Sequence, residues 1–312
     1  MTADSPKLFT HILVDIDATA HSHPALDRAL RLARRTGATL TVVDVVTVPS
    51  YARRYLSSDL EEEIVNRRRR QLEAIAASAA GVRVTTKLLV GRPATVLIQE
   101  VLRSKHDLLM RSHARELTEG VRRPFGAIDM ELLRKCPCPV LLVQHGGLEE
   151  RPLVVGAINA STEEPSEAAL NTKIVELTLL MAELENGIPG LLQAWAPFAE
   201  RVVRSHTSEA GFAAYVEDVR QRTAGDLQRL VQSFGSRLHG VKTIHRRGDA
   251  ADVILDAVVS QGIELVVMGT VARGGIAGLL IGNTAERVLG RLPCSVLAIK
   301  PDGFVCPVTL TD

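Results

Sequence analysis

Residues 134–143, RKCPCPVLLV, return near the end of the chain as residues 290–299, GRLPCSVLAI. The alignment pairs Cys138 with Cys294, and a short apolar run follows the cysteine in both stretches. Self-similarity of this kind indicates a repeated structural unit. The chain is therefore predicted to contain two similar halves.

A second match supports the same repeat. VGRPATVLI at 90–98 aligns with RGDAADVIL at 247–255, and the alignment pairs Gly91 with Gly248. In both halves, short β-branched runs such as ATLTVVDVV alternate with stretches whose apolar residues have helical spacing. Helices are expected at about 24–35 and 58–80 in the first half and at about 166–185 and 211–234 in the second.

Strands that alternate with helices form parallel sheets covered by helices on both faces. The predicted fold class is therefore α/β, with two tandem Rossmann-like domains, each a mainly parallel five-stranded sheet flanked by helices. A length of 312 residues also favours two cores over one. The polar stretch HGGLEERP, residues 145–152, is the expected linker, so that one domain covers 1–148 and the other 149–312.

Composition and charge indicate which kinds of partner the protein is expected to bind and where in the cell it is expected to lie. The chain has 37 basic and 36 acidic residues, so no overall field attracts nucleic acid or an acidic membrane surface. The arginines at 67–70 lie beside the glutamates at 61–63 and are interpreted as a solvated, salt-bridged helix face. We find neither an apolar signal segment nor an apolar run of about 20 residues. We expect a cytoplasmic protein without a membrane span or a nucleic-acid partner.

The four cysteines are too few for a disulfide framework and indicate a reducing compartment. Cys138 and Cys294 open apolar strands, where free cysteine behaves as a small buried apolar residue. No cysteine pair has the spacing of a zinc site with nearby histidines, so no metal site is expected.

The stretch GTVARGGIAGLLIGNTAERV, residues 269–288, is the candidate site for a phosphate. Ligands of open parallel sheets bind beyond the carboxyl ends of the strands, and this loop follows the fourth strand of the second half. Glycines allow the backbone to approach an anion, and a helix N-terminus stabilises negative charge. Asn283 is expected to cap the next helix, with Glu286 in a capping-box arrangement. The alternative is a loop that only connects a strand to a helix.

Motifs of other nucleotide sites and of hydrolases are absent from the sequence. There is no G-x-x-x-x-G-K-[ST], no G-x-G-x-x-G after the first strand of either half, and no G-x-S-x-G. Nor do we find paired carboxylates on one face, an activated nucleophile or an acidic magnesium motif. No catalytic residue is predicted, and any enzymatic activity is expected to be at most a slow ATPase.

The loop, its helix and the strand after it resemble the universal stress protein superfamily, whose ATP-binding members carry G-x2-G-x9-G-[ST]. Gly269 and Gly282 match the first and third glycines with the correct spacing. Ala272 replaces the second glycine, and Asn283 replaces the Ser/Thr, which is followed by Thr284. The tail GNTAERVLGRLPCSVLAIKPDG is similar to that of the tandem E-type members, and the resemblance spans essentially the whole chain.

The resemblance implies an adenine nucleotide, with Mg if it is ATP, in the second half. In the family an acid at the end of the first strand contacts the nucleoside, the end of the second strand contacts adenine, and the loop holds the phosphates. Asn159 stands at the position of that acid, which Asp17 retains in the first half. The first-half loop has Arg111 where the first glycine belongs and keeps Gly126. The candidate binding residues are Asn159, Ala160, Gly269, Ala272, Arg273, Gly282, Asn283 and Thr284, with Asp17 and Gly126 in the first half.

The function that the resemblance implies is stress survival, with ATP binding in the second domain. The final apolar strands, 140–143 and 296–299, are edge candidates that are expected to pair with each other or across chains in self-association. Two alternatives remain open. One is a nucleotide-free interaction module or apolar-ligand binder that uses the paired domains as a docking surface. The other is a weak nucleotide or acyl hydrolase.

Overall fold

The chain divides into two compact units by its internal contacts. The computed structural model describes residues 9–47, 57–113, 116–118, 121–123, 125–144, 150–270 and 281–310. Of these, unit 1 holds 9–144, 281 and 295–310, and unit 2 holds 150–270 and 282–294. The last strand and the tail after it therefore belong to the first unit by their contacts.

The sheet of unit 1 has the order β3-β2-β1-β4-β7-β12. Its strands are β1 (His11–Asp15), β2 (Thr39–Val46), β3 (Val84–Val90), β4 (Leu108–His113), β7 (Val140–Gln144) and β12 (Ser295–Ile299). Neighbours from β3 to β7 are parallel, and β12 is antiparallel to β7. Apolar side chains of β1 and β7 are buried, as expected for strands covered on both faces.

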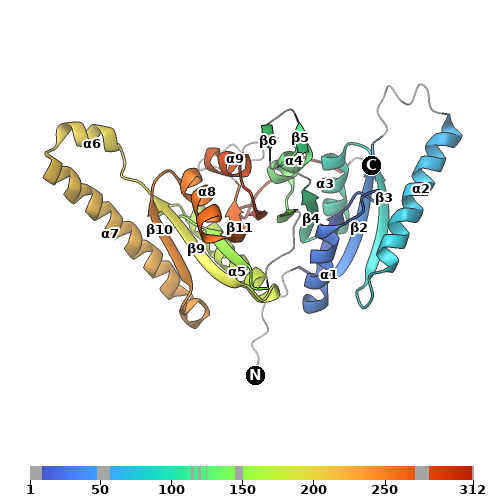
Figure 1. Cartoon of the computed structure of the whole chain (residues 1–312), viewed down its shortest axis with the longest axis horizontal. Helices are drawn as coiled ribbons and strands as arrows, with labels where there is room; N and C mark the ends of the chain where they lie inside the picture. Colours follow the sequence, from blue (N-terminus) through green and yellow to red (C-terminus); the bar gives the residue numbers. More distant parts are fainter. Residues whose placement is uncertain are drawn as a thin grey trace. The chain divides into compact units, whose positions relative to one another are not determined.

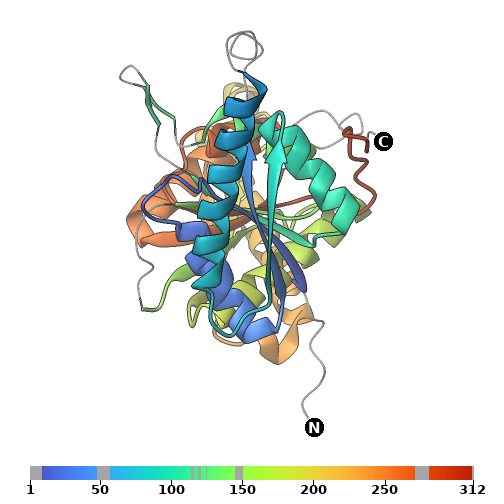
Figure 2. The ribbon, with the colours of Figure 1, turned by 90° about the vertical axis from the view of Figure 1, so that its right-hand side faces the viewer.

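Four helices and a short hairpin complete the described part of unit 1. The helices are α1 (Pro24–Thr36), α2 (Ser58–Ala77), α3 (Pro93–Ser104) and α4 (Ala127–Lys135), and the hairpin joins β5 (Glu116–Thr118) to β6 (Val121–Arg123). Proline opens α1 and α3, where its missing N–H costs no hydrogen bond. Gly37 ends α1 in the left-handed conformation with a φ of 73°. Helix α2 packs against the edge strand β3, and Figure 2 shows both nearest the viewer.

Unit 2 repeats this arrangement, with the strand order β10-β9-β8-β11 and parallel neighbours throughout (Figure 1). The strands are β8 (Leu153–Ala157), β9 (Ile188–Trp195), β10 (Lys242–Arg247) and β11 (Ile263–Gly269). The helices are α5 (Pro165–Leu184), α6 (Glu200–His206), α7 (Glu209–Ser233), α8 (Ala250–Gln261) and α9 (Asn283–Leu289), with a 3₁₀ helix at Gly235–Leu238. The predicted α/β class is confirmed, and each expected helix is found within three residues of its expected bounds. Helix α6 was not expected.

The final strands of the two halves were expected to pair with each other or across chains. In the structure β12 pairs with β7 of the same chain. Leu297 lies opposite Leu141 in the antiparallel ladder, and both side chains are buried. The Gln144 N–H donates to Ser295 Oγ at 3.1 Å beyond the ladder. Because β7 pairs with β4 on one side and with β12 on the other, it has no free edge.

Equivalent glycines confirm the internal repeat. The Gly91 N–H donates to the carbonyl of Val46 at 3.1 Å, and the Gly248 N–H donates to that of Trp195 at 2.9 Å. The two glycines have φ of 145° and 147°, values that other residues rarely adopt. The repeat in the sequence therefore preserves a turn whose conformation depends on glycine.

A close approach of strand to helix fixes one position of β8. A Cβ added to Gly156 would lie 2.6 Å from Thr178 Oγ1 and 3.0 Å from the Cγ2 of Ile174 in α5. Thr178 Oγ1 donates to the Ile174 carbonyl at 2.7 Å, so its position is already fixed. Glycine at 156 is thus required by packing.

The substitution Gly156→Ala tests this packing. We expect it to lower the free energy of unfolding by about 1–3 kcal/mol, because the added methyl overlaps buried atoms. Adding Thr178→Ala should recover most of the loss, since it removes the nearest atom. Chemical denaturation of the two variants, with Thr178→Ala alone as the control, measures both effects. Full stability of Gly156→Ala would contradict the packing argument.

Candidate functional site

The carboxyl ends of β8, β9 and β11 lie at one edge of the second sheet, where the candidate site was expected. Asn159 follows β8, and its backbone is held by Asn171 of α5 through bonds of 3.1 Å and 2.7 Å. Its side-chain amide donates to Glu167 Oε1 at 3.0 Å, and Thr162 Oγ1 donates to Glu167 Oε2 at 2.6 Å. Glu167 therefore brings a carboxylate beside Asn159, where the resemblance led us to expect an acid.

Gln193 in β9 was not predicted from the sequence. Its side chain is 1% exposed, and its amide nitrogen donates to Ser161 Oγ at 3.0 Å and to the Thr223 carbonyl at 3.4 Å. Its Oε1 atom is buried and has no hydrogen-bond partner within the described part of the chain. Leaving such an acceptor unpaired costs about 1–3 kcal/mol. A polar residue within the apolar run GLLQAW is the signal that would have identified it.

An aromatic pair lies next to Gln193. The rings of Trp195 and His245 are 5.6 Å apart and nearly parallel, and His245 lies opposite Gln193 in the β9–β10 ladder. His245 Nε2 is 2.9 Å from Thr223 Oγ1. Burial, with a smaller contribution from Arg220, lowers the pKa of His245, so the neutral ring is favoured. A flat surface and an open acceptor are thus close together at the end of β9.

The two ends of the candidate phosphate loop meet in unit 2. The Gly282 N–H donates to the Thr270 carbonyl at 3.0 Å, one residue beyond the end of β11. A Cβ at Gly269 would lie 2.7 Å from Leu170 Cδ2, so a larger residue there would have to displace this half-buried side chain of α5. Ala272 and Arg273 lie outside the described residues.

The expected cap of the last helix was wrong by one residue. The N-cap of α9 is Gly282, with extended backbone, and Asn283 is the first helical residue. The Gly282 carbonyl accepts from the Glu286 N–H at 2.9 Å, so the predicted capping box with Asn283 is absent. The side chains of Asn283 and Thr284 are exposed instead.

The first unit carries ion pairs at the corresponding edge. Asp17 Oδ1 accepts from Arg68 Nη1 at 2.9 Å and from Thr19 Oγ1 at 2.6 Å. Arg68 Nη2 also donates at 2.8 Å to Asp44, which is almost fully buried. Burial alone would raise the pKa of Asp17, but the bonds from Thr19 and Arg68 keep it below its usual value. Burial raises the pKa of Asp44 despite Arg68.

This network corrects the interpretation of the arginine run at 67–70. Arg70 pairs with Glu63 at 3.4 Å on the exposed face of α2, as expected. Arg68 instead points to the end of the sheet and binds two carboxylates there. Helical periodicity places one arginine of a run of four on the inner face.

A second group of ion pairs in unit 1, the Arg111 cluster, consists of Asp15, Arg111 and Asp129. Arg111 Nη1 donates to Asp15 Oδ2, and its Nε donates to Asp129 Oδ1 at 2.9 Å. Asp129 Oδ2 accepts from the Gly126 N–H at 3.0 Å. The formal charge of the cluster is negative, which disfavours a polyphosphate. Arg111 and Gly126 are therefore occupied by contacts within the protein.

Strand register shows which residue of the second half replaces Arg111. Asp15 and Ala157 hold equivalent positions in the first strand of each half. Asp15 pairs with Val43, and Ala157 pairs with Leu192. In each half the N–H of the following residue donates to the carbonyl of that partner. Asp15 lies opposite Arg111, whereas Ala157 lies opposite Met268.

Met268 is thus the counterpart of Arg111, and Ser112 is the counterpart of Gly269. The expectation that Arg111 stands at the first glycine was wrong by one residue. The alignment of Gly91 with Gly248, continued along the chain without a gap, gives the same pairing. Since Gly126 and Gly282 are both helix N-caps, Asp129 corresponds to Ala285.

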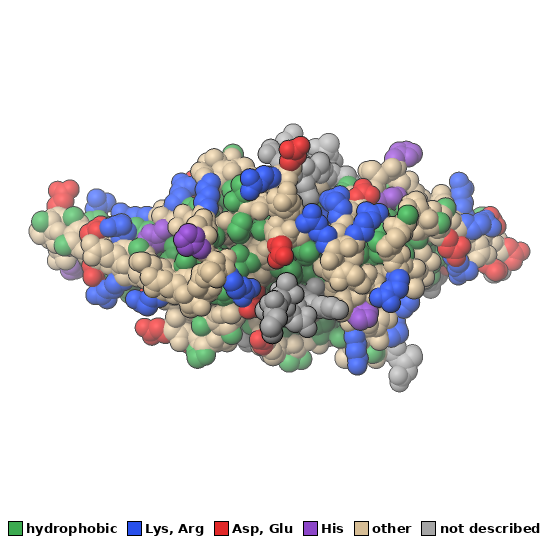
Figure 3. All heavy atoms as spheres, turned by 90° about the horizontal axis from the view of Figure 1, so that it is seen from below, with side chains coloured by type: hydrophobic (Ala, Val, Ile, Leu, Met, Phe, Trp, Pro, Cys, Tyr) green, Lys and Arg blue, Asp and Glu red, His purple; other side chains and the backbone are tan. Residues whose placement is uncertain are grey.

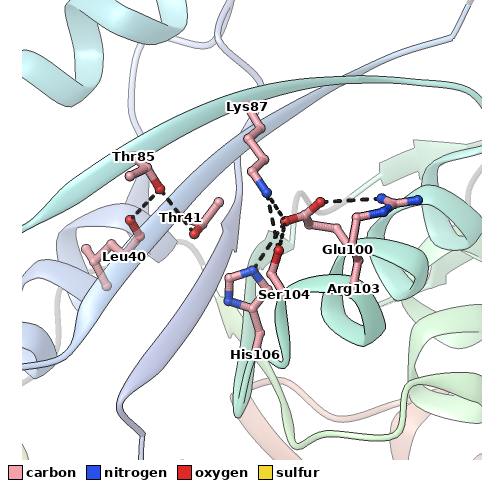
Figure 4. Close-up of polar contacts among 8 residues, drawn as sticks. All are labelled: Leu40, Thr41, Thr85, Lys87, Glu100, Arg103, Ser104 and His106. Carbon is pink, nitrogen blue, oxygen red and sulfur yellow. Dashed lines mark hydrogen bonds and ion pairs between the residues drawn. The ribbon is translucent and has the colours of Figure 1, made fainter.

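A further buried cluster lies on α3 and β3 (Figure 4). Glu100, which is 2% exposed, accepts from Lys87 Nζ at 2.5 Å and from Ser104 Oγ at 2.7 Å. Arg103 Nη1 is 3.7 Å and His106 Nε2 is 3.5 Å from the same carboxylate. Burial alone would raise the pKa of Glu100, but Lys87 and Ser104 lower it. Burial lowers the pKa of His106, and Glu100 opposes that shift.

The described residues contain no group of three or more His, Cys, Asp or Glu side chains suited to a metal ion. None of the described helices is both long and apolar enough to cross a membrane. The face shown in Figure 3 carries basic and acidic side chains interspersed, in agreement with the net charge of +1.

Replacing Arg111 tests the cluster that it holds. We expect Arg111→Met to lower the free energy of unfolding by about 3 kcal/mol, because two buried carboxylates lose their cation. The triple change Asp15→Ala, Arg111→Met and Asp129→Ala, which installs the residue types of unit 2, should restore most of it. Urea unfolding compares the two variants. A triple variant no more stable than Arg111→Met would contradict the pairing.

His106 predicts a pH dependence of stability. Its pKa is lower in the folded than in the unfolded chain, where it is near 6.5, so the unfolded chain gains the proton first. Stability contributed by this residue is therefore present above about pH 6.5 and is lost as the pH falls. We expect His106→Gln to reduce the change in unfolding free energy between about pH 7 and pH 5, and His245→Gln to act in the same direction. An unchanged slope in His106→Gln would contradict a neutral buried ring.

Comparison with known proteins supports the predicted family. The model of the Universal stress protein family matches residues 8–144 and 190–300. Universal stress protein E of Escherichia coli (strain K12) is 32% identical over 314 residues, which cover 98% of this chain and 98% of that protein. The Universal stress protein E homolog of Haemophilus influenzae is 28% identical and covers 94% of this chain and 98% of its own.

A solved structure shares the fold. It is a putative universal stress protein from Pseudomonas aeruginosa UCBPP-PA14, with a TM-score of 0.71, 22% identity, and coverage of 95% of both chains. The family match includes both halves, and similarity to the E-type protein extends over nearly the full length. This chain belongs to the universal stress protein family.

Proposed function

We propose that this protein acts in stress survival by binding an adenine nucleotide in its second unit. The observation that supports this most is the buried Oε1 of Gln193, an acceptor without a partner in the described residues at the carboxyl end of β9. The exocyclic amine of adenine is a donor that would complete this bond, and the flat rings of Trp195 and His245 lie beside it. The family resemblance independently assigns adenine to the end of the second strand.

The rest of the nucleotide would extend along the same edge of the sheet. Asn159 and Ala160 follow β8, and Glu167 gives the Asn159 amide a carboxylate partner for orienting a ribose hydroxyl. The phosphates, with Mg if the ligand is ATP, would bind the segment from Gly269 to Gly282. Its other candidate residues are Ala272, Arg273, Asn283 and Thr284.

Unit 1 is proposed to hold no nucleotide. Asp17 is bound by Arg68, and Gly126 donates to Asp129, so both first-half candidates have partners within the protein. The two carboxylates bound to Arg111 would also repel phosphates. We therefore expect one nucleotide for each chain.

Binding without rapid hydrolysis is the proposed activity. A general base must be free to take a proton from the attacking water. Glu167, the carboxylate beside Asn159, already accepts a bond at each oxygen. Any ATPase activity should consequently be slow.

The proposed location is the cytoplasm, and the proposed ligand is a free nucleotide rather than nucleic acid. Self-association through the final strands stays a prediction. It would require β12 to leave β7, because β7 has no second edge to offer.

Paired glycine substitutions test the assignment. Gly282→Asp should abolish nucleotide binding, since a carboxylate would face the phosphates, while aspartate remains a good N-cap for α9. The matched change Gly126→Asp, at the N-cap of α4, should leave binding intact. Gln193→Leu should weaken it about 3- to 10-fold through loss of one hydrogen bond.

Calorimetric titration of the full chain with ATP and magnesium measures all three, and native mass spectrometry of the freshly purified protein detects a bound nucleotide. Equal binding by Gly282→Asp would remove the site assignment. No heat and no bound nucleotide in the parent protein would overturn the function and favour an interaction module.

A further inference from the structure

Three of the four cysteines gather at the C-terminal end of α4 in unit 1. Cys136 is the C-cap of the helix, and Cys138 follows after one proline. Their Sγ atoms are 3.5 Å apart, and both side chains are buried. Cys306, in the tail after β12, donates its S–H to the Lys135 carbonyl at 3.2 Å. Thiols from two distant parts of the sequence thus lie together at the end of α4.

A buried cation completes this group. Lys300 is 6% exposed, donates to the Leu133 carbonyl of α4, and has its Nζ 5.1 Å from the centre of the Phe304 ring. A positive charge is favourable at a helix C-terminus, where carbonyl groups lack partners. Burial lowers the pKa of Lys300 to about 8, and the negative charge of a Cys136 thiolate opposes that shift.

The two thiols of the Cys-Pro-Cys stretch are not equivalent. The hydrogen bond to Cys136, followed by burial, raises the pKa of Cys138 well above that of a free thiol. Cys138 therefore keeps its proton and donates it toward Cys136. Cys136 has the Cys138 thiol at 3.5 Å and the Lys300 ammonium at the same end of α4, two groups that favour a negative charge on its sulfur.

We propose that Cys136 and Cys138 form a reversible disulfide in response to hydroperoxides, with Lys300 positioning the Cys136 thiolate. The thiolate attacks one oxygen of the peroxide, the O–O bond breaks, and the leaving oxygen takes a proton as an alcohol or water. Cys136 is then a sulfenic acid. Cys138 attacks this sulfur, the S–O bond breaks, and the hydroxide leaves as water with the Cys138 proton. Two electrons pass from the thiols to the peroxide.

The tail after β12 is anchored beside the pair, at the residue that precedes Cys136. Residues 301–310 form no helix or strand, and they attach to unit 1 through the bond from Cys306 to Lys135 and a bond from Gln99 to the Thr309 carbonyl at 3.1 Å. Contacts of this kind open locally at low cost. Oxidation would act on α4, whose first turn carries Asp129 of the Arg111 cluster.

The direct test uses the reduced full chain and hydrogen peroxide. After treatment, free thiols are blocked with N-ethylmaleimide under denaturing conditions, and peptides are mapped by mass spectrometry. We expect a Cys136–Cys138 disulfide that dithiothreitol reverses, and the same product in Cys294→Ser. Full alkylation of both thiols, or a disulfide that includes Cys306, would overturn the proposal.

Two variants separate the roles of the thiols and the lysine. Cys138→Ser should leave a Cys136 sulfenic acid that dimedone captures. Lys300→Met should slow oxidation at pH 7 about tenfold and move its pH profile upward by about one unit, whereas Lys300→Arg should retain both. An unchanged pH profile in Lys300→Met would remove the lysine from the mechanism, and circular dichroism confirms that each variant is folded.

Discussion

The hydrogen bonds between β12 and β7 are the constraint on which the first unit depends. They fix the last strand of the chain to β7, in a unit whose other strands all come from the first half. Because β12 runs antiparallel to β7, the chain leaves it toward the end of α4. This direction delivers Lys300 and Cys306 to carbonyl groups that a helix cannot satisfy by itself. The pairing of β12 with β7 therefore leads both to the capping of α4 and to the grouping of the thiols.

The two halves keep one backbone and differ in the charges at its functional edge. Gly91 and Gly248 share a conformation that depends on glycine, which shows how closely the backbones agree. At the same edge, however, the Arg111 cluster of unit 1 corresponds to Ala157, Met268 and Ala285 in unit 2. Buried charges must be paired inside the protein, whereas an apolar edge leaves the polar contacts to a ligand. A duplicated fold can thus assign stability to one half and binding to the other.

Local patterns in the sequence were sufficient for the fold class, the repeat and the helix positions, because periodicity and glycine spacing report on backbone conformation. Local patterns did not give the correct counterpart of Gly269 or the correct N-cap of α9, because each assignment depends on a shift of one residue. Strand register makes Ser112 rather than Arg111 the counterpart of Gly269, and α9 begins after Gly282 rather than after Asn283. Hydrophobic periodicity does not locate a loop residue or a helix cap to within one position.

Gln193 and Arg68 show a different limit. Gln193 is a single polar residue in an apolar strand, and Arg68 is one of several arginines in a charged helix. The pattern of neither stretch indicates the role of the individual residue. Their roles depend on partners about 30 and about 50 residues away, at Ser161 and at Asp17. The aligned positions 44 and 193 carry Asp and Gln, both nearly fully buried. In unit 1 an arginine from α2 satisfies this buried position, whereas in unit 2 the acceptor stays open among the described residues. Since an unpaired buried acceptor is costly, the open Oε1 of Gln193 is consistent with the proposed nucleotide site, in which a ligand would supply the donor.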